Sequence, residues 1–71
     1  MNLLKFIPDD RQVDAMNVSM FLCKKDIATV SVVEAYYLWE MFSGSQCASW
    51  LIVCDKTLED FEYFMKERIN D

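Results

Sequence analysis

The chain contains no histidine, one glycine and one proline among its 71 residues. Without histidine, the commonest general base of enzymes and the commonest metal ligand are both missing. With so little glycine and proline, we do not expect long loops or linkers, and we predict a single domain over residues 1–71. A chain of this length is near the lower limit for folding without disulfides or metals, so each large apolar side chain matters.

Cysteine is also scarce, and its pattern predicts no special chemistry. The three cysteines are at positions 23, 47 and 54, and no two of them form a C-x-x-C pair. An odd number leaves at least one free thiol, which argues against a secreted disulfide scaffold. A zinc site would need all three thiolates and a carboxylate. We therefore expect reduced, mostly buried cysteines, no metal, no cofactor and a cytoplasmic location.

Long apolar runs and clustered positive charge are lacking as well. The longest strongly apolar segment, CASWLIVC at 47–54, is far shorter than the roughly 20 residues that span a bilayer. The N-terminal MNLLKFIPDD has neither the length nor the cleavage region of a signal peptide. The only adjacent cations are Lys24 and Lys25, too few for a nucleic-acid surface. We expect a soluble protein that binds neither membranes nor nucleic acid directly.

Negative charge, by contrast, is abundant in the second half of the chain. Residues 1–35 carry four basic and five acidic side chains, and residues 36–71 carry three and seven, which together give the net charge of −5. Two interpretations stay open: an acidic surface that attracts a basic partner, or a solvated face that keeps an apolar protein soluble. Because these carboxylates fall mostly on predicted polar faces and no histidine accompanies them, we do not expect an enzyme.

The first helix is predicted over residues 10–24. Pro8 precedes two aspartates, which suit the first turn of a helix because the helix dipole favours negative charge there. Apolar residues then recur at three- and four-residue spacing, which predicts one buried stripe. That stripe consists of Val13, Met16, Met20 and Cys23, widened by Phe21.

The second helix is predicted over residues 31–43, with Ser31 and Glu34 as its capping box. Its sequence, SVVEAYYLWEMF, places apolar side chains around nearly the whole circumference. We expect the first and third helices each to cover one side of it. Two short amphipathic helices do not suffice to cover all of it, so a second copy or another protein is expected to cover the remainder.

The segment at 47–54 is the most ambiguous part of the chain. We favour a short, kinked helical continuation followed by an extended exit, with a buried β-strand as the alternative. The third helix is predicted over 58–69, after a capping pair of Thr57 and Asp60, with Glu62 and Lys66 spaced for an ion pair. The fold is therefore predicted to be a small all-α, three-helix domain, or an α+β fold if 47–54 is a strand.

A pattern of aromatic and small residues runs through the second half of the chain. A helix ends in Trp-x-x-Phe-Ser, a small-residue step leads into Ala-x-Trp-Leu, and a final helix contains Phe-x-x-Phe-Met. The residues are Trp39, Phe42, Ser43, Ala48, Trp50, Leu51, Phe61, Phe64 and Met65. This pattern resembles small bacteriophage proteins without assigned activities. The resemblance implies a phage accessory protein that inhibits or modulates a host or defence protein in the bacterial cytoplasm.

The predicted function is that of a small, acidic, non-enzymatic protein-binding module. Adjacent tyrosines on a helix cannot point the same way, so at least one of Tyr36 and Tyr37 should reach the surface, where tyrosine is a common anchor of interfaces. The alternative is an obligate homodimer through the 31–43 helix, with no catalytic role. The predicted partner-binding residues are Tyr36, Tyr37, Met41, Glu59, Glu62 and Glu67.

Overall fold

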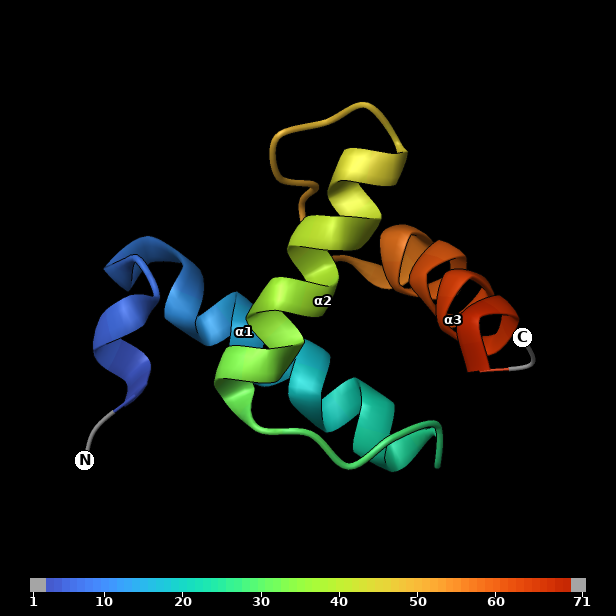
Figure 1. The fold of residues 1–71 in the computed structure, drawn as a ribbon, viewed down its shortest axis with the longest axis horizontal. Coiled ribbons are helices and arrows are strands. Elements are labelled where there is room, and N and C mark those ends of the chain that lie inside the picture. Colours follow the sequence, from blue (N-terminus) through green and yellow to red (C-terminus); the bar gives the residue numbers. More distant parts are fainter. Residues whose placement is uncertain (1–2, 70–71) are drawn as a thin grey trace.

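The computed structural model describes the backbone of residues 3–69 and the side chains of residues 5–68. A short 3-10 helix, η1 (Leu3–Phe6), precedes three α-helices: α1 (Asp9–Lys24), α2 (Val32–Ser45) and α3 (Asp55–Ile69). α2 crosses in front of α1, and α3 lies to one side of both (Figure 1). No strand occurs within residues 3–69, so the all-α, three-helix prediction is confirmed and the α+β alternative is wrong.

The first two helices start where their capping signals predict. α1 follows Pro8 and has both aspartates in its first turn. At the start of α2, the Ser31 hydroxyl accepts a hydrogen bond from the backbone N–H of Glu34 at 3.2 Å, as the capping box requires. α2 runs two residues beyond its predicted end, to Ser45. It stops before Cys47, whose left-handed φ of 59° cannot continue a helix.

The third helix starts three residues earlier than predicted, at Asp55 rather than 58. Thr57 was expected to precede the helix, but it lies within the first turn. Its hydroxyl reaches back and accepts a hydrogen bond from the backbone N–H of Cys54 at 3.0 Å. The backbone N–H of Leu58 already donates to the Cys54 carbonyl at 2.8 Å. Thr57 therefore caps the helix from inside its first turn, by accepting a hydrogen bond from the residue that precedes the helix. The helix accordingly starts before Thr57 and not after it.

The segment at 47–54 is neither the helical continuation nor the strand predicted from its sequence. Two side chains of α2 hold its backbone in an irregular path. The indole N–H of Trp39 donates to the Leu51 carbonyl at 2.9 Å, and the Leu51 N–H donates to the buried Ser43 hydroxyl at 3.1 Å. Because side chains satisfy these backbone groups, apolar residues here can pack on the core without forming regular structure.

The core lies between α2, α1 and α3. Trp39 is fully buried, and its ring lies 5.2 Å from that of Phe42 and 4.9 Å from that of Phe61. The buried cluster comprises Val18, Leu22, Ala35, Trp39, Phe42, Phe61 and Met65. Both neighbouring helices therefore cover α2, as expected from its sequence. The 47–54 segment also packs across the helices, as expected, because Trp50, Leu51 and Val53 contact this cluster.

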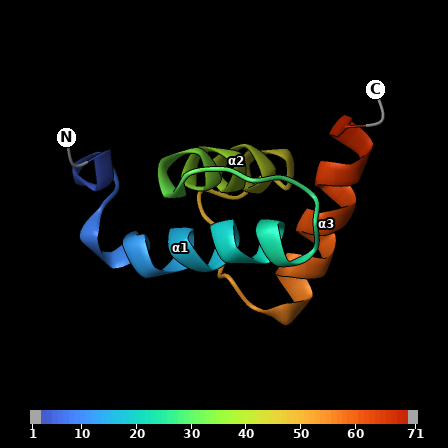
Figure 2. The ribbon, with the colours of Figure 1, turned by 90° about the horizontal axis from the view of Figure 1, so that it is seen from below.

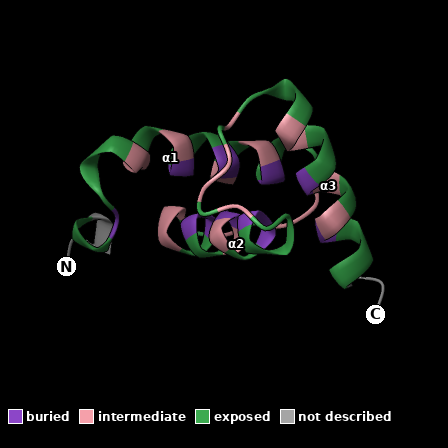
Figure 3. Ribbon diagram, turned by 90° about the horizontal axis from the view of Figure 1, so that it is seen from above, coloured by how far each residue is buried: buried purple, intermediate pink, exposed green. Residues whose placement is uncertain are grey.

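The buried stripe predicted for the first helix is wrong except at Phe21, which is partly buried against the main cluster. Val13, Met16 and Met20 are 62%, 40% and 67% exposed, and Cys23 is exposed too. The side of α1 that faces α2 carries Ala15, Val18 and Leu22 instead (Figure 3). Both sets of residues have helical spacing, and spacing alone does not say which one faces the core. The inner face carries one small and two branched aliphatic side chains, and the two methionines are on the outer face.

The expectation of mostly buried cysteines is also wrong. All three are exposed and free. Cys23 lies on the outer face of α1, Cys47 follows the end of α2, and Cys54 immediately precedes α3. Two of the three thus occupy helix boundaries, where the chain returns to the surface.

The predicted ion pair in the third helix is confirmed, since the Lys66 ammonium lies 2.8 Å from the Glu62 carboxylate.

Candidate functional site

The two adjacent tyrosines of α2 have different environments. Tyr36 is 7% exposed, its ring stacks on Trp50 with 5.1 Å between centroids, and its hydroxyl donates to the Glu40 carboxylate at 2.8 Å. Burial and this hydrogen bond raise the pKa of Tyr36 above its usual range. Tyr36 thus belongs to the core and offers little surface to a partner.

Tyr37 and Met41 lie one turn apart on the outer face of α2. They are 51% and 44% exposed, respectively. This pair is the part of the predicted partner-binding set that α2 presents to solvent. The predicted glutamates are all on α3, so the predicted set is divided between two helices. Their role in binding a partner stays a prediction.

The three predicted glutamates of α3 also differ from one another. The Glu62 carboxylate lies between the ammonium groups of Lys66, at 2.8 Å, and Lys25, at 3.9 Å. The hydrogen bond from Lys66 is the main cause that lowers the pKa of Glu62. Because Lys25 directly follows α1, this carboxylate links α3 to the end of α1. Glu59 is exposed, and Glu67 is exposed at the edge of a cavity.

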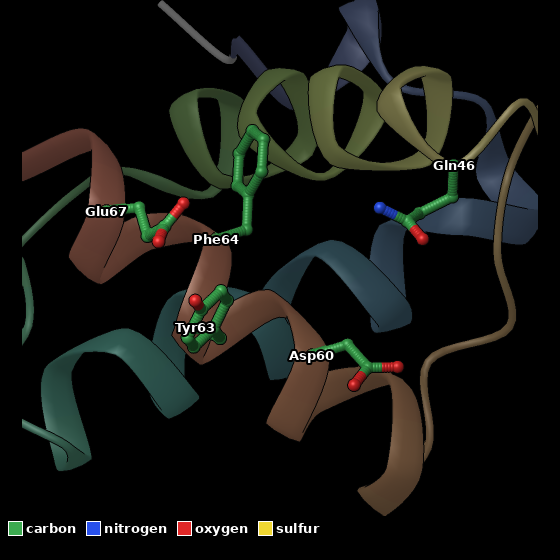
Figure 4. A pocket seen from close by; sticks show the side chains of 5 residues that line it. All are labelled: Gln46, Asp60, Tyr63, Phe64 and Glu67. Atoms are coloured by element: carbon green, nitrogen blue, oxygen red, sulfur yellow. The ribbon is translucent and has the colours of Figure 1, made fainter.

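That cavity has a volume of about 380 Å³. It lies between α3 and the residue that follows the C-terminal end of α2 (Figure 4). Gln46 lies on the α2 side, and Phe64 points toward α2. The remaining lining residues lie along α3 at helical spacing, so they share a face. The residues that line this groove are Gln46, Asp60, Tyr63, Phe64 and Glu67.

The groove is acidic and aromatic. Among the described residues, no lysine or arginine forms an ion pair with Asp60 or Glu67. Glu67 accepts a hydrogen bond from the Tyr63 hydroxyl and disfavours the phenolate, which raises the pKa of Tyr63. At neutral pH this tyrosine therefore stays protonated and presents an uncharged ring, 68% exposed, between two carboxylates. Arg68 lies over the Phe64 ring, 5.5 Å from its centroid.

This chemistry suits the binding of a cation. Carboxylates attract a positive charge, and the exposed face of a tyrosine ring adds a cation–π contribution. Within residues 3–69, no three cysteine, aspartate or glutamate side chains gather as metal ligands would. No helix in the described part of the chain is long and apolar enough to cross a membrane.

Sequence reasoning found only Glu67 of the groove. It used Asp60 only in a capping pair and Phe64 only in the aromatic pattern, and it did not single out Tyr63. A signal was present, because the spacing of 60, 63, 64 and 67 is that of one helix face. The contribution of Gln46 could not be foreseen, since it depends on where α2 ends and how the chain turns there.

Comparisons with known protein families, with characterised proteins and with solved structures give no match to this chain. The fold and the groove are therefore the basis for a function.

Proposed function

We propose that this protein is a non-enzymatic binding module that holds a basic segment of a partner protein in the groove between Gln46 and α3. The observation that carries the proposal is the pair of carboxylates, Asp60 and Glu67, on either side of the exposed Tyr63 ring with no ion-pair partner among the described residues. A lysine or arginine side chain of a partner would supply the missing charge. The net charge of −5 would attract such a segment from a distance.

Each lining residue has a distinct part in the proposed contact. The two carboxylates would accept charge-assisted hydrogen bonds from a guanidinium or ammonium group, while the Tyr63 ring would stack against its stem or cationic head. Gln46 would add a neutral hydrogen bond from the opposite wall. Since Arg68 already lies over Phe64, a bound cation would occupy the Tyr63 side of the groove. Exposed charge pairs contribute modestly, so the aromatic contact has to supply part of the affinity.

The resemblance to phage proteins supports a class of partner. A compact phage accessory protein in the bacterial cytoplasm would act on a host or defence protein, by inhibiting or redirecting it. An acidic groove favours a partner surface that is basic, such as one that normally contacts nucleic acid.

A second candidate function is homodimerisation through α2. Exposure of Tyr37 and Met41 on its outer face favours this candidate. The rest of the apolar surface of α2 is largely covered within the chain, which leaves a small area for such an interface. We therefore rank it below the groove.

The test is an affinity capture from bacterial lysate with the immobilised protein, in two salt concentrations. We expect a double variant, Asp60→Asn with Glu67→Gln, to lose the captured protein, because both carboxylates are neutralised without a change in shape. Capture by the unmodified chain should also fall at high salt. The matched control is Glu59→Gln, which removes one exposed charge of α3 outside the groove. Capture that survives the double variant would refute the groove as the binding site.

A further inference from the structure

The outer face of α1 carries a stripe of large apolar side chains that the chain does not cover. Val13, Met16 and Met20 are all on this face and are the residues misassigned to the core above. In the view from below, α2 lies along one side of α1 (Figure 2), and the stripe is on the side opposite to the buried residues of α1. Cys23 continues the same stripe with an exposed thiol. We call the four residues the outer stripe.

The spacing of the outer stripe is that of a helix pair. Its residues follow one another at intervals of three, four and three, which is two heptads of a and d positions. Such a narrow a/d stripe packs against a single second helix rather than into a broad core. The inner face of α1 packs against α2, and no other helix of the described residues covers the outer stripe.

We propose that the outer stripe pairs with the same stripe of a second copy, with the two α1 helices antiparallel. The charges at the two ends of α1 decide both the occupant and the direction. The helix has Asp9 and Asp10 in its first turn, Lys24 in its last, and Lys25 directly after it. An antiparallel pair brings acidic ends to basic ends twice, whereas a parallel pair brings like charges together.

The register follows from the stripe. With the two-fold axis between Met16 and Met20, Met16 lies against the partner's Met20 and Val13 lies against the partner's Cys23. At the flanking e positions, Asp10 faces the partner's Lys24, and Asn17 faces the partner's Asn17 across the axis. All three of these flanking side chains are exposed in the single chain. One interface thus combines apolar contact, two ion pairs and an amide pair, each complementary to its own copy.

This dimer does not depend on the proposed function of the groove. None of its residues lines the cavity at α3. Two heptads form a short interface, below the standard size of stable complexes, so we expect a concentration-dependent dimer. The dimer would carry two grooves and so bind a partner with paired sites through avidity.

Sedimentation equilibrium of the full chain over a wide concentration range tests the pairing. We expect the average mass to rise from monomer to dimer, and Met20→Lys to raise the dissociation constant at least about tenfold, since it places two charges beside the axis. The matched control, Met41→Lys on the outer face of α2, should leave the constant unchanged. Met20 and Met41 are both exposed, so neither change should unfold the chain. A monomer at every concentration would overturn the proposal, as would a dimer broken by Met41→Lys alone.

Cross-linking tests the direction of the pair. In a background with Cys47→Ser and Cys54→Ser, Val13→Cys should give a disulfide-linked dimer under mild oxidation, because position 13 faces Cys23 of the partner subunit. Without Val13→Cys the same background should stay uncross-linked. A dimer linked between two copies of Cys23 would show parallel helices and overturn the antiparallel arrangement.

Exchanging the charges tests the proposed ion pairs. The variants Asp10→Lys and Lys24→Glu should each dimerise more weakly alone than when mixed with each other. Equally weak dimerisation in the mixture would contradict the proposed ion pairs.

Discussion

α1 and α2 pack against each other, yet they differ in how many of their large apolar side chains they bury. α2 directs Trp39 and Phe42 inward, where α1, α3 and the 47–54 segment enclose them. α1 directs Ala15, Val18 and Leu22 inward and leaves Met16 and Met20 outside. The buried aromatic rings of the main cluster thus come from α2 and α3, and α1 contributes only aliphatic side chains.

This division explains where the surface of the molecule is available for binding. A helix with apolar residues around most of its circumference, α2, ends up mostly covered, because three segments of the same chain converge on it. A helix of ordinary amphipathic pattern, α1, contacts α2 with one face and keeps a second apolar face exposed. Amphipathicity alone is therefore a poor guide to exposure when two apolar stripes compete for one neighbour.

The largest expected effect on the free energy of unfolding comes from truncating a buried side chain of α2. Trp39→Ala should destabilise the domain by about 3–5 kcal/mol, since it removes a fully buried ring and the indole that holds the Leu51 carbonyl. That loss is comparable to the whole free energy of unfolding of a domain this small. Tyr37→Ala, on the outer face, should change stability by no more than about 0.5 kcal/mol. Urea titration followed by circular dichroism measures both, and similar losses for the two variants would contradict the assignment of faces.

A smaller effect separates the two faces of α1. Leu22→Ala should cost about 2–5 kcal/mol because Leu22 is fully buried in the main cluster. Met20→Ala, two positions earlier, should stay within about 0.5 kcal/mol for the monomer. The measurement is thermal unfolding at a concentration where the protein is monomeric, so that loss of a dimer contact does not enter. If Met20→Ala proved the more damaging, the inner and outer faces would have to be exchanged.

Much of the fold could be predicted from local signals. The capping box at Ser31 and the acidic first turn before residue 13 each involve neighbours in sequence, and both helices begin where these signals stand. Thr57 also caps a helix, but its hydroxyl reaches the preceding Cys54 rather than the following turn. A threonine can serve at either end of a capping box, and sequence spacing does not say which.

The misplaced features depend on contacts between distant residues. Which face of α1 is buried depends on how closely α2 approaches, and the irregular path of 47–54 depends on hydrogen bonds from Trp39 and Ser43, several residues earlier. The groove likewise needs Gln46 and Tyr63 to meet across two helices. Composition predicted an acidic surface, but only the packing shows which carboxylates lack a cation. Glu62 illustrates this, since its negative charge is already neutralised by two lysines.

The smallest expected effect concerns that ion-paired carboxylate and its dependence on pH. Lys66, and then Lys25, lower the pKa of Glu62 in the folded chain. The stabilisation is therefore present above the pKa of the unfolded carboxyl and is lost as the pH falls through the lower folded pKa. Glu62→Gln should remove that part of the pH dependence, so its urea midpoint should fall less on acidification than that of the unmodified chain. Glu59→Gln, which removes an exposed glutamate with no ion pair among the described residues, should leave the acid slope closer to the original. Equal slopes for Glu62→Gln and the unmodified chain would mean that the link between α3 and the end of α1 contributes nothing in solution, as is common for solvent-exposed ion pairs.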